Sequence, residues 1–339
     1  MVNKKLIFLI ISLNFLFLNC TKKIKTNIIK VGFLFPFNTR VGESMKKSAI
    51  MCVEEINKNR GIIINKNGKK TTYKIKLVFI DDGYTDIAKG SYNFRTAIEK
   101  YNLKYIIGGL LSKTVLPLME IMAEKKVLWL CVGGASSRIV KKIENNYQRY
   151  KYYFRVGVLD TLKQSRVVAD FAVKTFLPKG MKKIAAIGLN HSYGKLVLNR
   201  VTNLLKIAGF KIIYKKFISA TQKIFKPIFN KIKDANAILC VFLSKESENF
   251  IKWAGKNGIN KNIPIFGIIP QAFETGFFKL TNKGAAYISV YQSMGGPVDK
   301  TGKNLPNIFI KKYKKKYGKH PLWLSQGTYD SFKLLKKCI

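Results

Sequence analysis

Two predicted strand ends combine glycine with small hydroxyl side chains. Ser112 and Thr114 follow the apolar run that ends at Gly108-Gly109, and the run 127–132 is followed by Gly133-Gly134-Ala135-Ser136-Ser137. At the start of a helix, free backbone N–H groups and the positive end of the helix dipole favour an anion such as a carboxylate. Plain helix capping by the same hydroxyls is the alternative interpretation. The pattern indicates hydrogen bonding to a small polar molecule, without a reactive group.

Residues suited to catalysis are scarce. The chain has two histidines, His191 and His320, and neither has a companion at the spacing of metal ligands. No G-x-S-x-G nucleophile motif occurs. The segment 188–195 resembles a phosphate-binding loop but has five residues between its glycines instead of four, and Leu196 replaces the hydroxyl that would hold Mg²⁺. Asp81-Asp82 is interpreted as a turn or cap. We therefore expect no enzymatic activity, no metal and no cofactor.

Strand and helix patterns alternate along the chain. In the first series, apolar runs predict strands at 28–35, 73–80, 105–107 and 127–132, with helices between them. A polar, tyrosine-rich stretch at 144–153 precedes a second series with strands at 183–188, 210–218, 237–243, 263–268 and 286–291. Two helices near 307–317 and 324–337 close the chain.

Two consecutive series of β-α units predict an α/β fold with two doubly wound, mostly parallel sheets, because parallel strands need crossover helices. In such sheets a ligand lies beyond the C-terminal strand ends, where the strand order reverses. Two lobes also create a cleft, and Tyr193, on a loop of the second lobe, could reach across it with its phenol. A core tyrosine whose hydroxyl is satisfied within its own lobe is the alternative.

The composition is strongly basic, with 62 Lys and Arg against 18 Asp and Glu, which gives a net charge of +44. Nucleic acid or an anionic membrane could be the cause. However, the excess is mostly lysine and is spread along the chain, so we expect no nucleic-acid partner. The lysine-rich run 311–317 is interpreted as the solvated face of a helix whose apolar side, with Phe309, Ile310, Tyr313 and Tyr317, faces inward.

The N-terminus has the features of an export signal: Lys4-Lys5, an apolar stretch over 6–18, and Asn19-Cys20 before a lysine-rich segment. The ending resembles a bacterial lipoprotein signal, in which the cysteine becomes a lipidated N-terminus. We expect a signal peptide over 1–19, lipidation of Cys20, a linker over 20–27 and an exported, membrane-anchored protein. An ordinary cleavage site is the alternative. Buried thiols are expected at Cys52, Cys131 and Cys240. One disulfide after export is the alternative, and the sequence does not name its pair of cysteines.

The ordered motifs resemble the type I periplasmic binding proteins, specifically the branched-chain amino acid receptors of ABC importers. The similarity covers about residues 28–339 and rests on these segments in order: 29–36, 49–61, Asp81-Asp82, 106–112, 133–136, Phe154-Arg155, Tyr193-Gly194, 250–258, Tyr317-Gly318 and Tyr329-Asp330. The resemblance implies two lobes joined by a hinge, with lobe 1 formed by 28–153 and 291–339 and lobe 2 by 154–290.

The resemblance also implies site residues. Ser112 and Ser136 match the groups that hold the ligand carboxylate, a carbonyl near Gly134 helps hold the ammonium, and Tyr193 matches the tyrosine of the second lobe. The acidic residue expected after Pro270 is replaced by Gln271, which carries no charge for an ammonium. Glu246 or Glu274 could substitute for it, or the ligand is an amide, a urea-like molecule or a carboxylate without an amine.

The implied partners are a small-molecule ligand, an amino acid or an analogue of one, and a membrane permease. A sensory module that signals to another protein is the alternative. Relatives usually continue beyond the Tyr-Asp helix and add a strand to the second lobe, whereas this chain stops at Cys338-Ile339, so the C-terminal part of the family pattern is expected to be missing.

Overall fold

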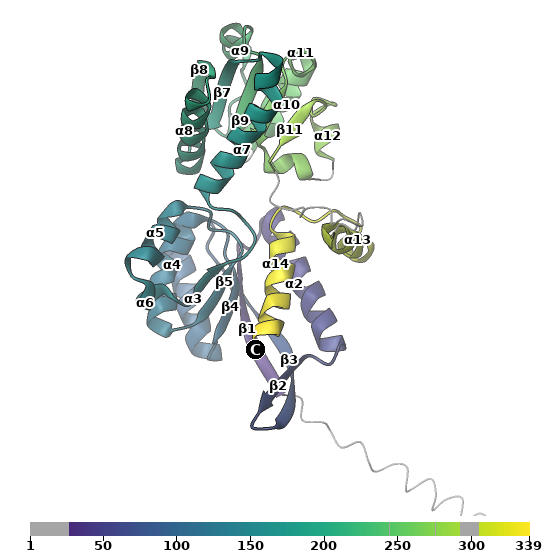
Figure 1. Cartoon of the computed structure of the whole chain (residues 1–339). Coiled ribbons are helices and arrows are strands. Elements are labelled where there is room, and N and C mark those ends of the chain that lie inside the picture. Colours follow the sequence, from purple (N-terminus) through teal and green to yellow (C-terminus); the bar gives the residue numbers. More distant parts are fainter. Residues whose placement is uncertain (1–26, 244, 275, 292–304) are drawn as a thin grey trace, which may run out of the picture.

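The computed structural model describes residues 27–243, 245–274, 276–291 and 305–339. Its strands form two separate sheets, one above the other in Figure 1. The predicted signal peptide and Cys20 lie outside the described residues. Within the described ranges, no helix is both long and apolar enough to cross a membrane.

The first sheet has six strands in the order β2-β3-β1-β4-β5-β6. Their bounds are β1 Asn27–Phe35, β2 Ile62–Lys66, β3 Lys69–Asp81, β4 Tyr105–Gly108, β5 Leu128–Cys131 and β6 Tyr153–Arg155. All neighbours are parallel except β2 and β3. We call this sheet and the helices packed on it lobe 1.

Helices cover both faces of the lobe-1 sheet. On one face lie α2 (Arg40–Lys58), α13 (Leu305–Tyr317) and α14 (Ser325–Cys338), and on the other α3 (Ile87–Tyr101), α4 (Ser112–Lys125), α5 (Ser137–Asn145) and α6 (Tyr147–Tyr150). Figure 1 shows the C-terminal helix α14 (yellow) beside α2 (purple), and their buried side chains share one core. Phe309 and Tyr313 of α13 point into this core, as predicted, while Lys311 and Lys312 are exposed.

The second sheet has five parallel strands in the order β11-β10-β9-β7-β8. Their bounds are β7 Lys183–Leu189, β8 Lys211–Ile218, β9 Ala237–Val241, β10 Ile265–Ile268 and β11 Ile288–Val290. The helices are α7 (Thr161–Phe176), η1 (Leu177–Lys179), α8 (Ser192–Ile207), α9 (Lys226–Ile232), α10 (Lys245–Lys256), α11 (Ile259–Asn262), η2 (Pro270–Phe273) and α12 (Phe277–Leu280). We call this sheet and its helices lobe 2. The predicted fold of two mostly parallel sheets is confirmed.

The β2–β3 hairpin was not predicted. Lys66 pairs with Lys69, so Asn67 and Gly68 form a two-residue loop, and both have positive φ (50° and 79°). Asn-Gly is a strong signal for this turn type. The signal was therefore present in the sequence, in a segment whose many lysines hide the alternation of a strand.

The strand β6 lies across the predicted boundary between residues 153 and 154. It pairs with β5 and therefore belongs to the lobe-1 sheet. The chain then enters lobe 2 through residues 156–160. The domain boundaries given above otherwise stay a prediction.

Candidate functional site

A cleft of about 830 Å³ lies between the two lobes. In lobe 1 the strand order reverses between β1 and β4, and in lobe 2 between β7 and β9. The loops after these four strands line the cleft, with Thr39–Val41, Leu110–Lys113, Leu189–Tyr193 and Leu243. Ligands of doubly wound sheets bind at such points, and the volume suits a small molecule.

Ser112 lines the lobe-1 wall of the cleft at the first residue of α4. It does not cap its helix, because Leu111 is the N-cap residue and supplies no side-chain hydrogen bond. Instead, Ser112 Oγ accepts a hydrogen bond from the backbone N–H of Ser136 at 3.0 Å. The hydroxyl proton of Ser112 has no acceptor among the described residues, so it can be donated to a ligand oxygen.

Gly134 also lines this wall, and the loop that holds it continues the sheet beyond its strands. The N–H groups of Gly133 and Gly134 donate to the carbonyls of Gly109 and Leu110, both at 2.9 Å. A Cβ on Gly133 would lie 2.3 Å from the Leu110 carbonyl oxygen, and Gly134 has φ +62°. Only glycine fits this close approach of two backbones.

Ser136 is not among the residues that line the cleft. Its Oγ caps α5 by accepting the N–H of Arg138 at 3.2 Å, and its carbonyl accepts from Arg155 Nη2 at 3.3 Å. A capping hydroxyl keeps its own proton, which has no acceptor within the described part of the chain. Ser136 thus adjoins Ser112 but does not face the cleft directly, and its binding role stays a prediction.

The loop that holds Gly134 and Ser136 is tied to the segment connecting the lobes. The N–H of Thr161 donates to the Ala135 carbonyl at 2.8 Å. Arg200 of α8 donates to Thr161 Oγ1 at 2.8 Å and to Ser137 Oγ at 3.2 Å. These hydrogen bonds connect the cleft loop of lobe 1 to the start of α7 and to α8 in lobe 2.

Tyr193 lines the lobe-2 wall, and its phenol O–H donates to Gln164 Oε1. Gln164 is itself 4% exposed and donates to the Leu159 carbonyl at 2.6 Å. Burial, with a smaller effect of nearby Tyr291, raises the pKa of Tyr193 well above its ordinary value. The phenol therefore stays protonated, and its hydrogen is committed within lobe 2.

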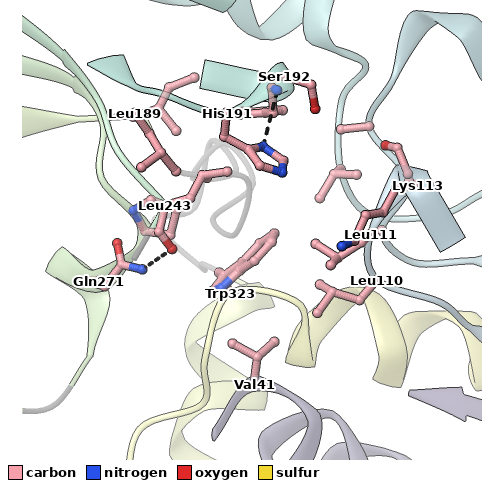
Figure 2. Close-up of a pocket in the computed structure, with 18 of the residues that line it drawn as sticks. Val41, Leu110, Leu111, Lys113, Leu189, His191, Ser192, Leu243, Gln271 and Trp323 are labelled. Atoms are coloured by element: carbon pink, nitrogen blue, oxygen red, sulfur yellow. Dashed lines mark hydrogen bonds between the residues drawn. The ribbon is translucent and has the colours of Figure 1, made fainter. Parts of the chain in front are cut away.

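Gln271 lines the same wall with both ends of its amide engaged. Its Nε2 donates to the Leu243 carbonyl, and its Oε1 accepts from Ser247 Oγ at 3.3 Å. Figure 2 shows the bond to Leu243 at the edge of the cleft. The predicted site residues Ser112, Gly134, Tyr193 and Gln271 thus line one cleft. Their roles toward a ligand stay predictions.

The two acidic residues considered as substitutes for an ammonium-binding carboxylate do not line the cleft. Glu246 is fully buried and accepts the N–H of Leu243 at 2.7 Å. Glu274, at the end of η2, forms an ion pair with Arg40, the first residue of α2. This ion pair joins the two lobes.

The sequence analysis did not name most of the lining residues as site residues, among them the four large or charged side chains of Arg40, Lys113, His191 and Trp323. His191 was judged only as a metal ligand. It caps α8, with Nδ1 accepting the N–H of Tyr193 at 3.4 Å, so Nε2 carries the proton of the neutral ring. Trp323, in the loop before α14, lies near Val41 at the lobe-1 side of the cleft (Figure 2). No local pattern marks these four residues as cleft residues.

The Asp81-Asp82 pair has the predicted turn role. Asp81 Oδ1 accepts the N–H groups of Phe37 and Gly83, and Asp82 Oδ1 accepts that of Tyr84. Asp82 is 1% exposed, and its Oδ2 has no partner among the described residues. Burial raises its pKa to about 6, with a smaller contribution from the neighbouring charge of Asp81.

The buried cysteines are inert packing residues. Cys52, Cys131 and Cys240 are free and buried as predicted, and Cys338 is free and exposed. Burial raises the pKa of Cys131 to about 11. Within the described ranges no three His, Cys, Asp or Glu side chains gather as metal ligands.

Comparison with known proteins gives the family. The model of the periplasmic binding protein family matches residues 28–339. The leucine-, isoleucine-, valine-, threonine- and alanine-binding protein of Pseudomonas aeruginosa is 24% identical over 217 residues, which are 63% of this chain and 53% of the relative. The chain thus spans about half the length of this curated relative.

Two solved structures show the same fold. The branched-chain amino acid substrate-binding protein of Streptococcus pneumoniae, in complex with isoleucine, has a TM-score of 0.73 at 19% identity, covering 92% of this chain and 83% of that one. A solute-binding protein of R. palustris in complex with 4-hydroxybenzoate has a TM-score of 0.67 at 19% identity, covering 92% and 80%. With a family model matched over nearly all the described residues, this chain belongs to the periplasmic binding proteins, a family of solute receptors.

Proposed function

We propose that this chain is the exported solute receptor of an ABC importer, which binds a small ligand between its lobes and delivers it to a membrane permease. The observation that carries the proposal is the cleft, because loops from the switch points of both sheets line it. A molecule held between two lobes stabilises the arrangement in which both touch it, so binding shifts the population toward closure.

The proposed ligand is a branched-chain amino acid or a related small polar molecule. The names of the relatives support this class, since the P. aeruginosa protein binds aliphatic amino acids and the S. pneumoniae protein holds isoleucine. The R. palustris protein holds 4-hydroxybenzoate, and a carboxylate is common to these ligands. Ser112, with Ser136 behind it, is the group proposed to bind that carboxylate, whereas the Gly134 carbonyl is proposed to accept from an ammonium where the ligand has one.

Lipidation of Cys20 is the proposed anchor and keeps the receptor beside its permease. Mass spectrometry of the mature protein tests it: a diacylated Cys20 is expected at the N-terminus. An unmodified residue at another position would remove the anchor without affecting the binding function.

Trp323 provides the test of binding. The chain has three tryptophans, and Trp129 and Trp253 do not line the cleft. Ligands from a panel of amino acids, amides and carboxylates are expected to change the tryptophan fluorescence of the wild-type protein. The change should disappear in Trp323→Phe, while calorimetry still detects binding.

A panel that gives neither heat nor fluorescence change would reject the proposed ligand class. Uptake of the labelled ligand by cells lacking the gene then tests transport. Unchanged uptake together with tight binding would favour the sensory alternative.

A further inference from the structure

We propose that the ligand is a carboxylate that has an apolar side chain and no ammonium group. Lys113 supplies the positive charge opposite the carboxylate. The inference rests on the proposed function, because it concerns the ligand of the same cleft. It follows from which charged groups of the chain remain available there.

No aspartate or glutamate is among the described residues that line the cleft, whereas Arg40, Lys113 and His191 all line it. A ligand ammonium taken out of water needs an opposite charge nearby. Glu246 is buried beneath Leu243, and Glu274 is neutralised by Arg40. Arg40 and Glu274 neutralise each other, so the positive charge of Lys113, which has no ion-pair partner among the described residues, opposes a cationic group.

Gln271 does not compensate for the missing carboxylate. Its Oε1, the atom that would accept from an ammonium, already accepts from Ser247, and its Nε2 is held by the Leu243 carbonyl. The amide is thus fixed in an orientation that closes the lobe-2 wall. One lone pair of Oε1 and one hydrogen of Nε2 remain for a ligand, but the neutral amide supplies no opposite charge for an ammonium.

Lys113 is exposed, lines the cleft and has no carboxylate within ion-pair distance among the described residues. It is the second residue of α4, directly after Ser112. The backbone N–H groups of these two residues have no acceptor within the described part of the chain, and the helix dipole is positive at this end. Hydroxyl, N–H groups and ammonium together form a site for one anionic group.

Several apolar side chains also line the cleft. Figure 2 shows Val41, Leu110 and Leu111 on the lobe-1 side, with Leu243 opposite and Trp323 between them. The net charge of +44 adds a long-range preference for anions over cations. The chemistry matches a short aliphatic or aromatic acid.

The test compares three molecules with one carbon skeleton: leucine, 4-methylpentanoate, which lacks the amine, and 3-methylbutylamine, which lacks the carboxylate. Benzoate serves as the aromatic acid. By isothermal titration calorimetry, one of the two simple acids should bind at least tenfold tighter than leucine, and the amine should give no heat.

Two variants assign the charges. Lys113→Met should weaken binding of the acid at least tenfold, while Lys141→Met, at an exposed position of α5 away from the cleft, should leave it unchanged. Arg40→Gln leaves the Glu274 carboxylate without its ion-pair partner. The affinity for leucine relative to the affinity for the acid should therefore rise at least threefold. Thermal melting of each variant checks that the fold is retained.

Leucine binding tighter than both acids, or equal losses in Lys113→Met and Lys141→Met, would overturn the inference and leave the proposed function standing. Binding of an amide from the wider panel, without binding of either acid, would also overturn the inference and leave the proposed function standing. If no molecule of any class binds, both proposals fail.

Discussion

The lobe-1 and lobe-2 walls of the cleft differ in how their polar side chains are used. On lobe 1, Ser112 and Ser136 accept backbone N–H groups and keep hydroxyl protons that have no acceptor among the described residues. On lobe 2, Tyr193 and Gln271 have directed their hydrogens to groups of their own lobe. The Ser112 hydroxyl can donate to a ligand without breaking a bond, whereas the Tyr193 hydrogen is already used within lobe 2; the hydroxyl of Tyr291, which also lines the cleft, has no partner among the described residues.

This difference indicates separate tasks for the walls. Donors fixed by a backbone network need no rearrangement to bind an anion, so we expect lobe 1 to supply most of the affinity. Because the hydrogen of Tyr193 is bonded within lobe 2, we expect this side chain to contribute mainly shape, and we propose that lobe 2 closes over a ligand already held by lobe 1. Three changes test this comparison.

The largest expected effect comes from removing both lobe-1 hydroxyls. Ser112 faces the cleft and Ser136 lies behind it, and a hydrogen bond to a charged group is worth about 1.5–3 kcal/mol, so Ser112→Ala/Ser136→Ala should weaken carboxylate binding at least about tenfold, mainly through Ser112. Calorimetry measures it. Ser219→Ala on the lobe-2 side of the cleft is the matched control and should change the affinity less than about threefold. Equal effects on the two walls would contradict the comparison.

A smaller effect concerns Asp82, whose carboxylate accepts the N–H of Tyr84, a residue that lines the cleft. Its folded pKa of about 6 exceeds the ordinary value of 3.8, so the folded state binds the proton more tightly than the unfolded state. Its contribution is therefore most favourable below about pH 4 and is lost as the pH rises through 6, by at most about 3 kcal/mol. Because an asparagine side chain does not ionise, Asp82→Asn should remove this loss of folding stability.

Urea unfolding at pH 4 and pH 7 measures the pH effect. The stability of Asp82→Asn relative to the wild-type protein should rise between these values. Asp234→Asn, at an exposed position of lobe 2, is the control and should show no such change. A constant difference at both pH values would show that Asp82 does not titrate in this range.

The smallest effect is expected for Tyr193→Phe. The change leaves Gln164 Oε1 without its donor, which costs about 1 kcal/mol of stability, and weakens ligand binding by less than about fivefold. Thermal melting and calorimetry measure the two effects, with the exposed Tyr92→Phe as control. A loss of affinity as large as that of the double serine variant would show that the phenol binds the ligand directly.

Part of the site was predictable because its signals are local. Ser112 and Gly134 follow apolar strands directly, and the ends of parallel strands meet at one edge of a sheet. Gln271 was flagged by its place after Pro270, and the structure adds that its amide is engaged on both sides. Ser136 was chosen by the same logic as Ser112, but the turn after Gly134 directs it toward α5.

The sequence alone determined the element types and the two parallel sheets, because the spacing of apolar residues and the glycines at strand ends act over a few residues. Only the tertiary structure decided which charges the cleft contains. Arg40 and Glu274 are far apart in the chain and belong to different lobes, yet they neutralise each other. Trp323 reaches the cleft only because α14 packs on α2. The charge available to a ligand depends on neighbours in space, and no local pattern of residues encodes them.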